Sequence, residues 1–111
     1  MRLVFTTVYE RKVRKLLSAR ERTVGEDEIA RDPTRWPILQ GTGGLRKARV
    51  ARGSSGKSSG ARVIYYFWVR EDLIYFLTVY SKSTQSDISP DEKKALKSLV
   101  QTLQRGHHGN R

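Results

Sequence analysis

The spacing of apolar residues in the first part of the chain predicts a strand followed by a helix. Leu3 to Thr7 is a short, mostly apolar run that fits an opening strand. From about Tyr9 the period becomes helical, because Val13, Leu16 and Leu17 fall on one face of a helix. The remaining faces of this helix carry the basic residues Arg11, Lys12, Arg14 and Lys15.

A second helix and a long connection are expected next. Ser18 and Glu21 have the spacing of a capping box, so the helix should begin there and run to about Arg31. Pro33 ends it, since the residue before a proline disfavours helical backbone. Residues 32–44 contain two prolines and three glycines, which indicates a loop.

The middle of the chain has the patterns of a sheet. Leu45 to Arg52 alternates as a strand does, and Ala61 to Val69 is rich in β-branched and aromatic residues, as a central strand is. The Gly- and Ser-rich segment Gly53 to Gly60 between them predicts a flexible hairpin tip. Arg70-Glu71-Asp72 is a turn, and Leu73 to Lys82 is the partner strand.

The last part of the chain predicts one amphipathic helix. Ser89 and Pro90 are typical of an N-cap and of the first helical position. Apolar residues then recur at helical spacing, at Leu96, Leu99, Val100 and Leu103. Gly106 is expected to end the helix, which leaves residues 106–111 as a disordered tail.

The predicted order β-α-α-β-β-β-α indicates an α+β fold. We expect a small twisted, mostly antiparallel sheet of about four strands, flanked by two N-terminal helices and one C-terminal helix. A chain of 111 residues can bury one modest core, so residues 1–105 should form a single domain. No apolar run approaches the roughly 20 residues that span a bilayer. We therefore expect a soluble cytoplasmic protein without a membrane partner.

Positive charge is concentrated in the segment with the strongest strand signals. The chain has 22 basic and 11 acidic residues, which gives a net charge of +11. Between Pro33 and Arg70 there are eight cations and no Asp or Glu. Cations on a sheet attract a polyanion, because they stabilise phosphates and release counterions. The sequence therefore favours a nucleic-acid partner.

Cations on the predicted strands are the first candidate site residues. Period-two geometry places Lys47 and Arg49 on one face of their strand, and Arg46 and Arg52 on the other. Two cations roughly 7 Å apart along one face match the spacing of successive phosphates in a single strand. A solvated edge strand protected by charge explains the same pattern about as well.

The next two strands supply further candidates. Suitable pairing would bring Arg62, Tyr80 and Lys82 into one cleft with Lys47 and Arg49, although the sequence does not fix the register. Core packing is expected for the aromatic residues Tyr65, Tyr66, Phe67, Trp68, Tyr75 and Phe76. Tyr80 is the exception, because it lies at a strand end between polar neighbours and is a candidate for base stacking.

Several chemistries are disfavoured by the residues present. The chain has no cysteine, and its two histidines are adjacent in the polar tail, so no thiol chemistry, zinc site or cofactor is expected. Lys57 lies in a Gly-Lys-Ser run that lacks the spacing of a phosphate loop, although it remains a cation that can contact a phosphate backbone. Glu26, Asp27 and Glu28 are interpreted as a solvated helix face, so two-metal nuclease chemistry is not expected.

Four stretches of the chain carry a family resemblance. They are GTGGLRKAR at 41–49, GARVIYY at 60–66, IYFLTVYSKS at 74–83 and the terminal helix from Ser89 to Leu103. In combination they resemble the RelE/HigB family of toxins from bacterial type II toxin–antitoxin systems, most closely the HigB-type, RelE-like branch. The resemblance covers about residues 3–104 and is specific only in combination.

The resemblance implies a ribosome-dependent mRNA endoribonuclease that inhibits translation and is neutralised by a cognate antitoxin, here expected to be HigA-like with a helix-turn-helix. The implied reaction is metal-free attack of the 2′-hydroxyl on the adjacent phosphate, with a 5′-hydroxyl as leaving group. The catalytic candidates are Lys47, Arg49, Arg62, Tyr80 and Lys82. The candidates for contact with RNA or the ribosome are Arg46, Arg52, Lys57, Arg11, Lys12, Arg14 and Lys15.

Side-chain chemistry narrows these roles. Arginine keeps its proton in proteins, so Arg49 and Arg62 can only donate to phosphate oxygens. Lys47 is therefore the candidate base, since neighbouring cations favour loss of its proton. Many family members place a catalytic tyrosine in the stretch that corresponds to residues 84–89, where this chain has none. Tyr80 is the candidate substitute.

Two other functions stay open. A ParE-type toxin that inhibits DNA gyrase belongs to the same superfamily, but that activity needs no cationic cleft. A simple nucleic-acid-binding module or repressor would need a reading helix, and the last helix is acidic at its start. The nuclease should arrest translation, and the gyrase inhibitor should instead cause DNA damage. A repressor should bind a DNA duplex tightly and with sequence preference.

Overall fold

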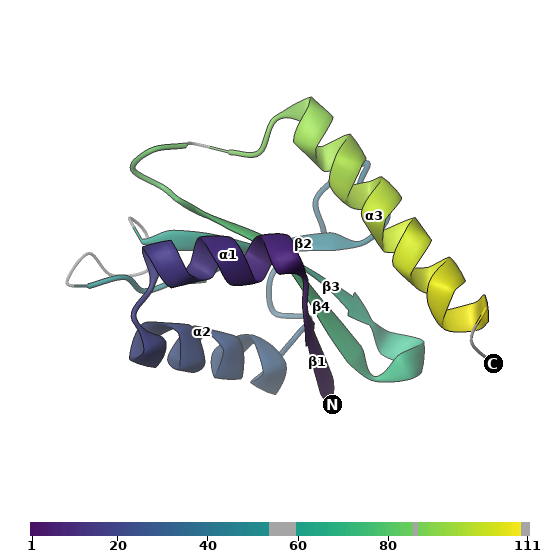
Figure 1. Cartoon of the computed structure of the whole chain (residues 1–111), viewed down its shortest axis with the longest axis horizontal. Helices are drawn as coiled ribbons and strands as arrows, with labels where there is room; N and C mark the ends of the chain where they lie inside the picture. The colour runs from purple at the N-terminus through teal and green to yellow at the C-terminus, as the bar shows by residue number, and fades with distance from the viewer. Residues whose placement is uncertain (54–59, 86, 110–111) are drawn as a thin grey trace.

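The chain forms one sheet with helices on both of its faces (Figure 1). The computed structural model describes residues 1–53, 60–85 and 87–109. In chain order the elements are β1 (Arg2–Phe5), α1 (Thr7–Leu16), α2 (Ala19–Arg31), β2 (Leu45–Val50), β3 (Ala61–Trp68), the 3-10 turn η1 (Val69–Glu71), β4 (Leu73–Ser81) and α3 (Pro90–Gly109). This is the predicted order, so the α+β class is confirmed.

The two most apolar strands lie at the centre of the sheet. The strand order is β1-β4-β3-β2. β1 pairs with β4 in parallel, whereas β4 with β3 and β3 with β2 are antiparallel. Every residue of β4 is buried, as expected of a strand that is covered on both faces.

Each face of the sheet packs against its own helices. One core joins α1 and α2 to the sheet and includes Tyr9, Val13, Ile29, Val63, Tyr65 and Phe76. The other core joins α3 to the opposite face and includes Leu45, Ile64, Leu77, Tyr80 and Val100. All six aromatic residues that were predicted to pack lie in or against these two cores. Burial of this apolar area is the main term that stabilises the fold.

Thr6 ends β1 and caps α1. Its side chain accepts a hydrogen bond from the Tyr9 N–H. Its hydroxyl also lies 3.0 Å from the carbonyl oxygens of Phe76 and of Leu77 in β4. β1 therefore ends at Phe5 rather than at the predicted Thr7. On the edge of β4 that faces away from β3, β1 pairs with the first half of the strand and α1 lies beside the second half.

α2 begins at the predicted capping box and packs closely on β2. Ser18 and Glu21 exchange hydrogen bonds of 2.8 and 3.1 Å between side chain and backbone. Gly25 lies in the middle of this helix, where an added Cβ would be 2.6 Å from a Val50 methyl carbon. Glycine therefore lets the helix and the strand approach closely.

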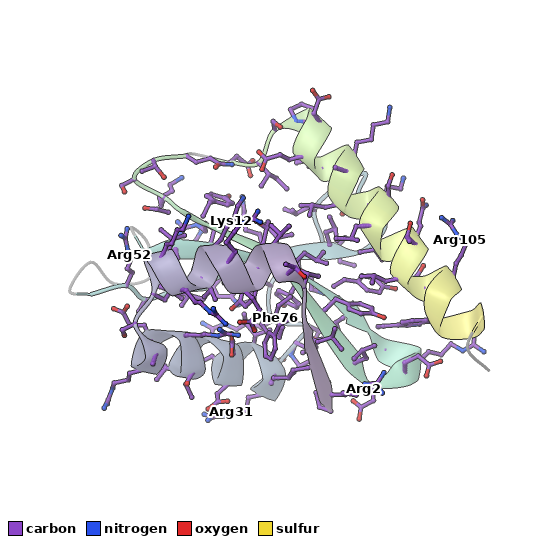
Figure 2. All side chains as sticks on the ribbon, viewed as in Figure 1. Arg2, Lys12, Arg31, Arg52, Phe76 and Arg105 are labelled. Atoms are coloured by element: carbon purple, nitrogen blue, oxygen red, sulfur yellow. The ribbon has the colours of Figure 1, made fainter. Side chains whose placement is uncertain are left out.

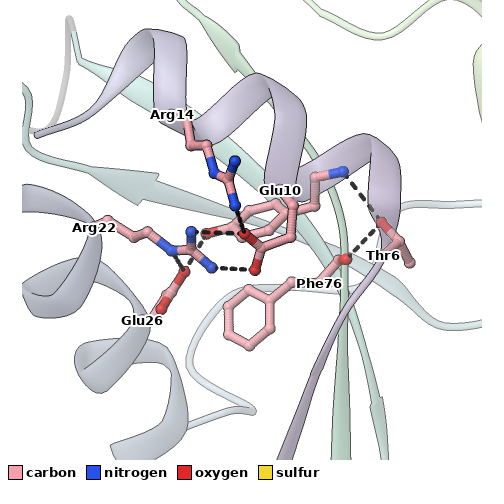
Figure 3. Close-up of polar contacts among 7 residues, drawn as sticks. Thr6, Glu10, Arg14, Arg22, Glu26 and Phe76 are labelled. Carbon is pink, nitrogen blue, oxygen red and sulfur yellow. Dashed lines mark hydrogen bonds and ion pairs between the residues drawn. The ribbon is translucent and has the colours of Figure 1, made fainter. Parts of the chain in front are cut away.

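Arg22 ties α1 to α2 (Figure 3). Its guanidinium contacts Glu10 at 2.6 Å and Glu26 at 2.7 Å, and its central carbon lies 5.0 Å from the centroid of the Phe5 ring. The Tyr9 hydroxyl donates to the same Glu26 carboxylate at 2.8 Å. The prediction of a solvated acidic face was therefore wrong for Glu26, because this carboxylate is the shared partner of Arg22 and Tyr9.

α3 extends three residues beyond its predicted end. Gly106 lies inside the helix, without a left-handed backbone, and an added Cβ there meets nothing within 4 Å. A glycine in an exposed helix costs only about 1 kcal/mol relative to alanine, so it does not have to end the helix. The prediction of a disordered tail was wrong as far as Gly109. Residues 110–111, and residues 54–59 of the predicted hairpin tip with Lys57, lie outside the described residues.

Candidate functional site

Two rows of side chains cross the sheet on the face that packs against α3. Strand pairing places Arg49, Arg62 and Tyr80 opposite one another on β2, β3 and β4. The neighbouring row consists of Lys47, Ile64 and Thr78. Adjacent strands lie about 4.8 Å apart, so the backbones at the two ends of a row are about 10 Å apart. The register that the sequence left open thus places Lys47, Arg49, Arg62 and Tyr80 side by side.

A β-bulge at Leu77 aims Tyr80 at this face. Tyr65 pairs with Phe76 and Ile64 with Thr78, so Leu77 is an extra residue between the two pairs. Tyr75 and Leu77 belong to the core under α3, and so does Tyr80, although strict alternation would turn Tyr80 to the opposite face. Bulges of this kind re-aim side chains near functional sites.

Lys47, Arg62 and Tyr80 form a cluster on this face, and Asp87 joins it from the connection between β4 and α3. Its Oδ1 accepts hydrogen bonds from Lys47 Nζ at 3.2 Å, from the Ile88 N–H at 2.8 Å and, at a longer 3.5 Å, from the Tyr80 hydroxyl. Partial burial raises the pKa of Asp87, but the Ile88 N–H and the Lys47 ammonium outweigh it and hold that pKa below its ordinary value. A carboxylate that is ionised at neutral pH therefore joins the lysine to the tyrosine.

Tyr80 offers its hydroxyl rather than its ring. The residue is only 5% exposed, so the ring is unavailable for the base stacking that was expected of it. Burial and the Asp87 charge raise the pKa of Tyr80 to about 12, with Arg62 acting in the opposite direction. The hydroxyl therefore keeps its proton at neutral pH and can donate it.

The arginines and Lys82 differ in how they face the cluster. Arg62 is 6% exposed and is the buried cation of the group. Arg49 is exposed, and its guanidinium carbon lies 5.9 Å from the centroid of the Trp36 ring. Trp36 packs against the core under α1 and α2, so the head group of Arg49 turns over the edge strand toward the opposite face and away from the cluster. Lys82 follows the end of β4 with an exposed side chain, while its N–H donates to Gly60 at 3.0 Å.

Lys12 approaches the cluster from α1. Its Nζ donates to the Thr78 hydroxyl at 3.3 Å, and Figure 2 shows it on the side of α1 that is turned away from α2. A hollow of about 250 Å³ separates α1 from the end of β4, with Lys12, Lys15 and Tyr80 in its lining. An extended anion that lies across the cluster can therefore also reach the cations of α1.

The remaining predicted cations make contacts elsewhere. Arg46 donates to the Trp36 carbonyl at 2.6 Å, and Arg52 donates to the Leu16 carbonyl at 3.1 Å. These contacts hold the loop and α1 in place on the other face of the sheet. The α1 residues Arg11, Arg14 and Lys15 are exposed.

Asp87 is the residue that the sequence reasoning missed. The argument from charge placed all carboxylates outside the basic segment, yet the chain returns over the sheet before α3 and brings Asp87 back to it. The signal was an acidic residue just before Ile88, the apolar residue that anchors this connection in the core. Lys47 was expected to act as a base with only cations around it. In the structure it instead forms an ion pair with Asp87 at 3.2 Å.

Other hollows lie away from the cluster. One of about 510 Å³ lies along α2 and the loop after it, between Val24 and Arg35, and one of about 520 Å³ lies between Trp68 and Arg105. Across the described ranges, no group of three or more His, Cys, Asp or Glu is placed to hold a metal ion. No helix in the same ranges is long and apolar enough to cross a membrane.

Solved structures of E. coli RelE have a similar fold. A double arginine-to-alanine mutant of this toxin in the free state is 20% identical, with a TM-score of 0.56 over 77% of this chain and 86% of that chain. The isolated toxin is 20% identical, with a TM-score of 0.55 over 88% of this chain and 97% of that chain. The toxin in the intact E. coli RelBE toxin–antitoxin complex is 20% identical, with a TM-score of 0.55. This match covers 72% of this chain and 94% of that chain.

The sequence itself shows the family. The model of the RelE toxin of the RelE/RelB toxin–antitoxin system matches residues 40–109, which is more than half of the chain. The matched segment contains β2, β3, β4 and α3, and therefore every residue of the cluster around Asp87. The chain belongs to the RelE family of toxins from toxin–antitoxin systems.

Proposed function

We propose that this toxin is an mRNA endoribonuclease that acts on ribosome-bound mRNA and so inhibits translation. One observation carries the proposal: the register of β2, β3 and β4 gathers fixed cations beside a protonated tyrosine on one face. A phosphate placed among Lys47, Arg62 and Tyr80 would receive charge-assisted hydrogen bonds. Such donors stabilise the charge that develops on a phosphate as its ester bond breaks.

The proposed reaction is transesterification without a metal ion. The 2′-oxygen attacks the adjacent phosphorus and the bond from phosphorus to the 5′-oxygen breaks, which gives a 2′,3′-cyclic phosphate and a 5′-hydroxyl. One proton leaves the 2′-hydroxyl, and one must reach the departing 5′-oxygen. Tyr80 is the proposed donor of the second proton, because its hydroxyl is protonated and lies in the cluster.

The arginines supply charge rather than protons. Arg62 is buried at the centre of the row, so its guanidinium acts in surroundings where water screens it little. Loss of one such donor typically lowers the rate by about 10²–10³. Arg49 near the end of β2 and Lys82 just after β4 are exposed, and from there they would bind the flanking phosphates. The cations of α1 would extend the contact to mRNA or ribosomal RNA.

We propose a cognate antitoxin as the protein partner. The E. coli RelBE complex is an assembly of a toxin with its antitoxin, and the chain shares the fold of that toxin. A HigA-like, helix-turn-helix antitoxin is the specific candidate from the sequence. Coexpression and copurification with the product of an adjacent reading frame would test this partner.

The proposed function is tested by mapping the 5′ ends of cellular mRNA after expression of the toxin. New ends should appear within translated regions in the wild type, and purified mRNA should be cut only when ribosomes are added. Arg62→Ala should lower the rate of cutting by about 10²–10³, whereas Arg70→Ala, an exposed cation in the turn before β4, should leave it unchanged. Cutting at the wild-type rate in Arg62→Ala, or a DNA-damage response without arrested translation, would contradict the proposal. The second result would favour a ParE-type inhibitor of gyrase.

A further inference from the structure

We propose that Asp87 accepts the proton of the attacking 2′-hydroxyl, and that Lys47 acts beside it as a fixed cation. This inference rests on the proposed nuclease function and names the proton acceptor of that same site. It replaces the role that the sequence alone assigned to Lys47.

The geometry places a carboxylate where the reacting groups would meet. Lys47 Nζ and the Tyr80 hydroxyl converge on the same oxygen of Asp87, at 3.2 and 3.5 Å. The Ile88 N–H fixes that oxygen from the backbone at 2.8 Å. The side chain of Asp87 is 49% exposed, so a substrate can approach the carboxylate while it stays anchored.

The protonation states favour Asp87 over Lys47 as acceptor. The pKa of Asp87 is held below its ordinary value despite partial burial, so the carboxylate is free of its proton throughout the neutral range. A lysine must first lose a proton before it can accept one, and Lys47 is in contact with a negative partner. As an ammonium, Lys47 can instead stabilise the phosphate as its charge grows.

The contact between Asp87 and Tyr80 also closes the proton balance. The 2′-hydroxyl proton passes to Asp87 as the bond from the 2′-oxygen to phosphorus forms. The Tyr80 proton passes to the 5′-oxygen as its bond to phosphorus breaks. Transfer from Asp87 back to the tyrosinate, across the 3.5 Å contact, then restores both groups. Lys47 and Arg62 keep their charges throughout.

Several charged groups surround this pair and shape its pH dependence. Arg62 on β3 lowers the pKa of Tyr80, whereas Asp87 and, more weakly, Glu92 of α3 raise it. Lys12 and Lys15 of α1 line the hollow that Tyr80 borders, and Lys47 contacts Asp87 itself. The rate should therefore fall on the acidic side as Asp87 gains a proton, and on the alkaline side only as Tyr80 loses one.

The test compares two conservative substitutions in single-turnover cleavage of ribosome-bound mRNA. Lys47→Arg keeps the charge but cannot act as a base, so it should stay within about tenfold of the wild-type rate. Asp87→Asn keeps the shape but cannot take up the proton, so it should lose about 10²–10⁴ in rate with little change in KM. The acidic limb of the pH–rate profile should disappear from the residual activity of Asp87→Asn.

Controls separate chemistry from folding. Asp87→Glu should retain part of the activity, and Asp91→Asn, an exposed carboxylate in the first turn of α3, should retain all of it. Circular dichroism should show that every variant is folded under the assay conditions, and a lower urea midpoint of Asp87→Asn would reflect only the lost contact with Lys47. If Asp87→Asn cleaves at the wild-type rate, or if Lys47→Arg is as inactive as Asp87→Asn, the inference is wrong. A wild-type protein that does not cleave would instead overturn the proposed function.

Discussion

Tyr80 shows how burial fixes both the direction and the protonation of a single hydroxyl. Its ring is packed in the core under α3, and only its hydroxyl reaches Asp87. The same burial that removes the ring from solvent disfavours the tyrosinate. Position in the sheet therefore decides both the direction and the protonation of the hydroxyl.

Removal of the Asp87 charge should lower the pKa of Tyr80. This pKa is about 12 in the wild type, because burial and Asp87 both raise it from the ordinary 10.0. The stability that depends on the neutral phenol is thus present below pH 10 and is lost as the pH rises through about 12. Ultraviolet titration of tyrosinate in the wild type and in Asp87→Asn measures the shift, with Tyr80→Phe identifying the signal of this residue. An unchanged Tyr80 titration in Asp87→Asn would contradict the assigned contact.

At the scale of the elements, close approach and ion pairing hold α1 and α2 to the sheet. Gly25 lets α2 reach Val50, and Arg22 joins the two helices through Glu10 and Glu26. Neither feature belongs to the candidate site. The Gly25 approach and the Arg22 ion pairs both lie on the opposite face of the sheet, where α1 and α2 pack. Their contributions to stability can be tested separately.

Two glycine substitutions should have opposite effects on stability. Gly25→Ala should destabilise the protein, because a Cβ at 2.6 Å from a Val50 methyl overpacks the interface by about 1–3 kcal/mol. Gly106→Ala, with nothing within 4 Å of the new Cβ, should stabilise it by about 0.4–1 kcal/mol. Urea unfolding measures both, and Val50→Ala should partly rescue Gly25→Ala. Stabilisation by Gly25→Ala would show that α2 is not constrained in this way.

Loss of the Arg22 network should weaken the protein and alter its response to acid. Arg22→Met should cost about 1–3 kcal/mol, since Glu10 and Glu26 both lose a charged partner. The hydrogen bond from Arg22 lowers the pKa of Glu10, so the stability from this pair is present above the ordinary value of 4.5 and is lost as the pH falls through the lowered one. Urea midpoints measured from neutral to acidic pH should therefore fall less steeply in Arg22→Met.

The exposed Arg20 on the same helix provides the control for that experiment. Arg20→Met should leave both the midpoint and its pH dependence unchanged. An equal loss in the two variants would mean that helix propensity, rather than the network, is responsible.

Local patterns predicted the elements well, because they depend on neighbours in sequence. The capping box placed the start of α2, and the apolar runs placed β3 and β4 within a residue or two. The face that carries Tyr80 was not predictable in the same way, because a bulge at Leu77 sets it through pairing with β3. Asp87 was missed for a related reason, since its contact with Lys47 joins residues 40 positions apart.

At the scale of the whole molecule, charge and topology act together. Strand pairing places the basic residues of β2 on one side of Tyr80, and the hollow beside β4 places Lys12 and Lys15 of α1 on the other. These residues come from opposite ends of the first half of the chain. Within the cluster, the carboxylate of Asp87 holds Lys47 and Tyr80 in place by hydrogen bonds. The surrounding cations supply attraction at longer range, as expected for a protein that approaches a polyanion.

The α1 cations should make a measurable contribution to RNA binding. If Lys12 and Lys15 each contact a phosphate, their joint replacement by alanine should reduce the slope of log K against log salt by about 1.4. Arg31 and Arg105 lie on α2 and α3, away from the cluster, and their joint replacement is the matched control (Figure 2). Fluorescence titration with a single-stranded RNA over a range of salt concentrations measures the slope. An equal reduction in both double variants would show that attraction is unspecific.

We propose that the cluster of Lys47, Arg62, Tyr80 and Asp87 cuts RNA by internal transesterification. The chemistry of the ends that the purified toxin produces on ribosome-bound mRNA tests this directly. We predict 2′,3′-cyclic phosphate and 5′-hydroxyl ends with the wild type, formed about 10²–10³ more slowly with Arg62→Ala. Ends that carry a 5′-phosphate and a 3′-hydroxyl would contradict internal transesterification.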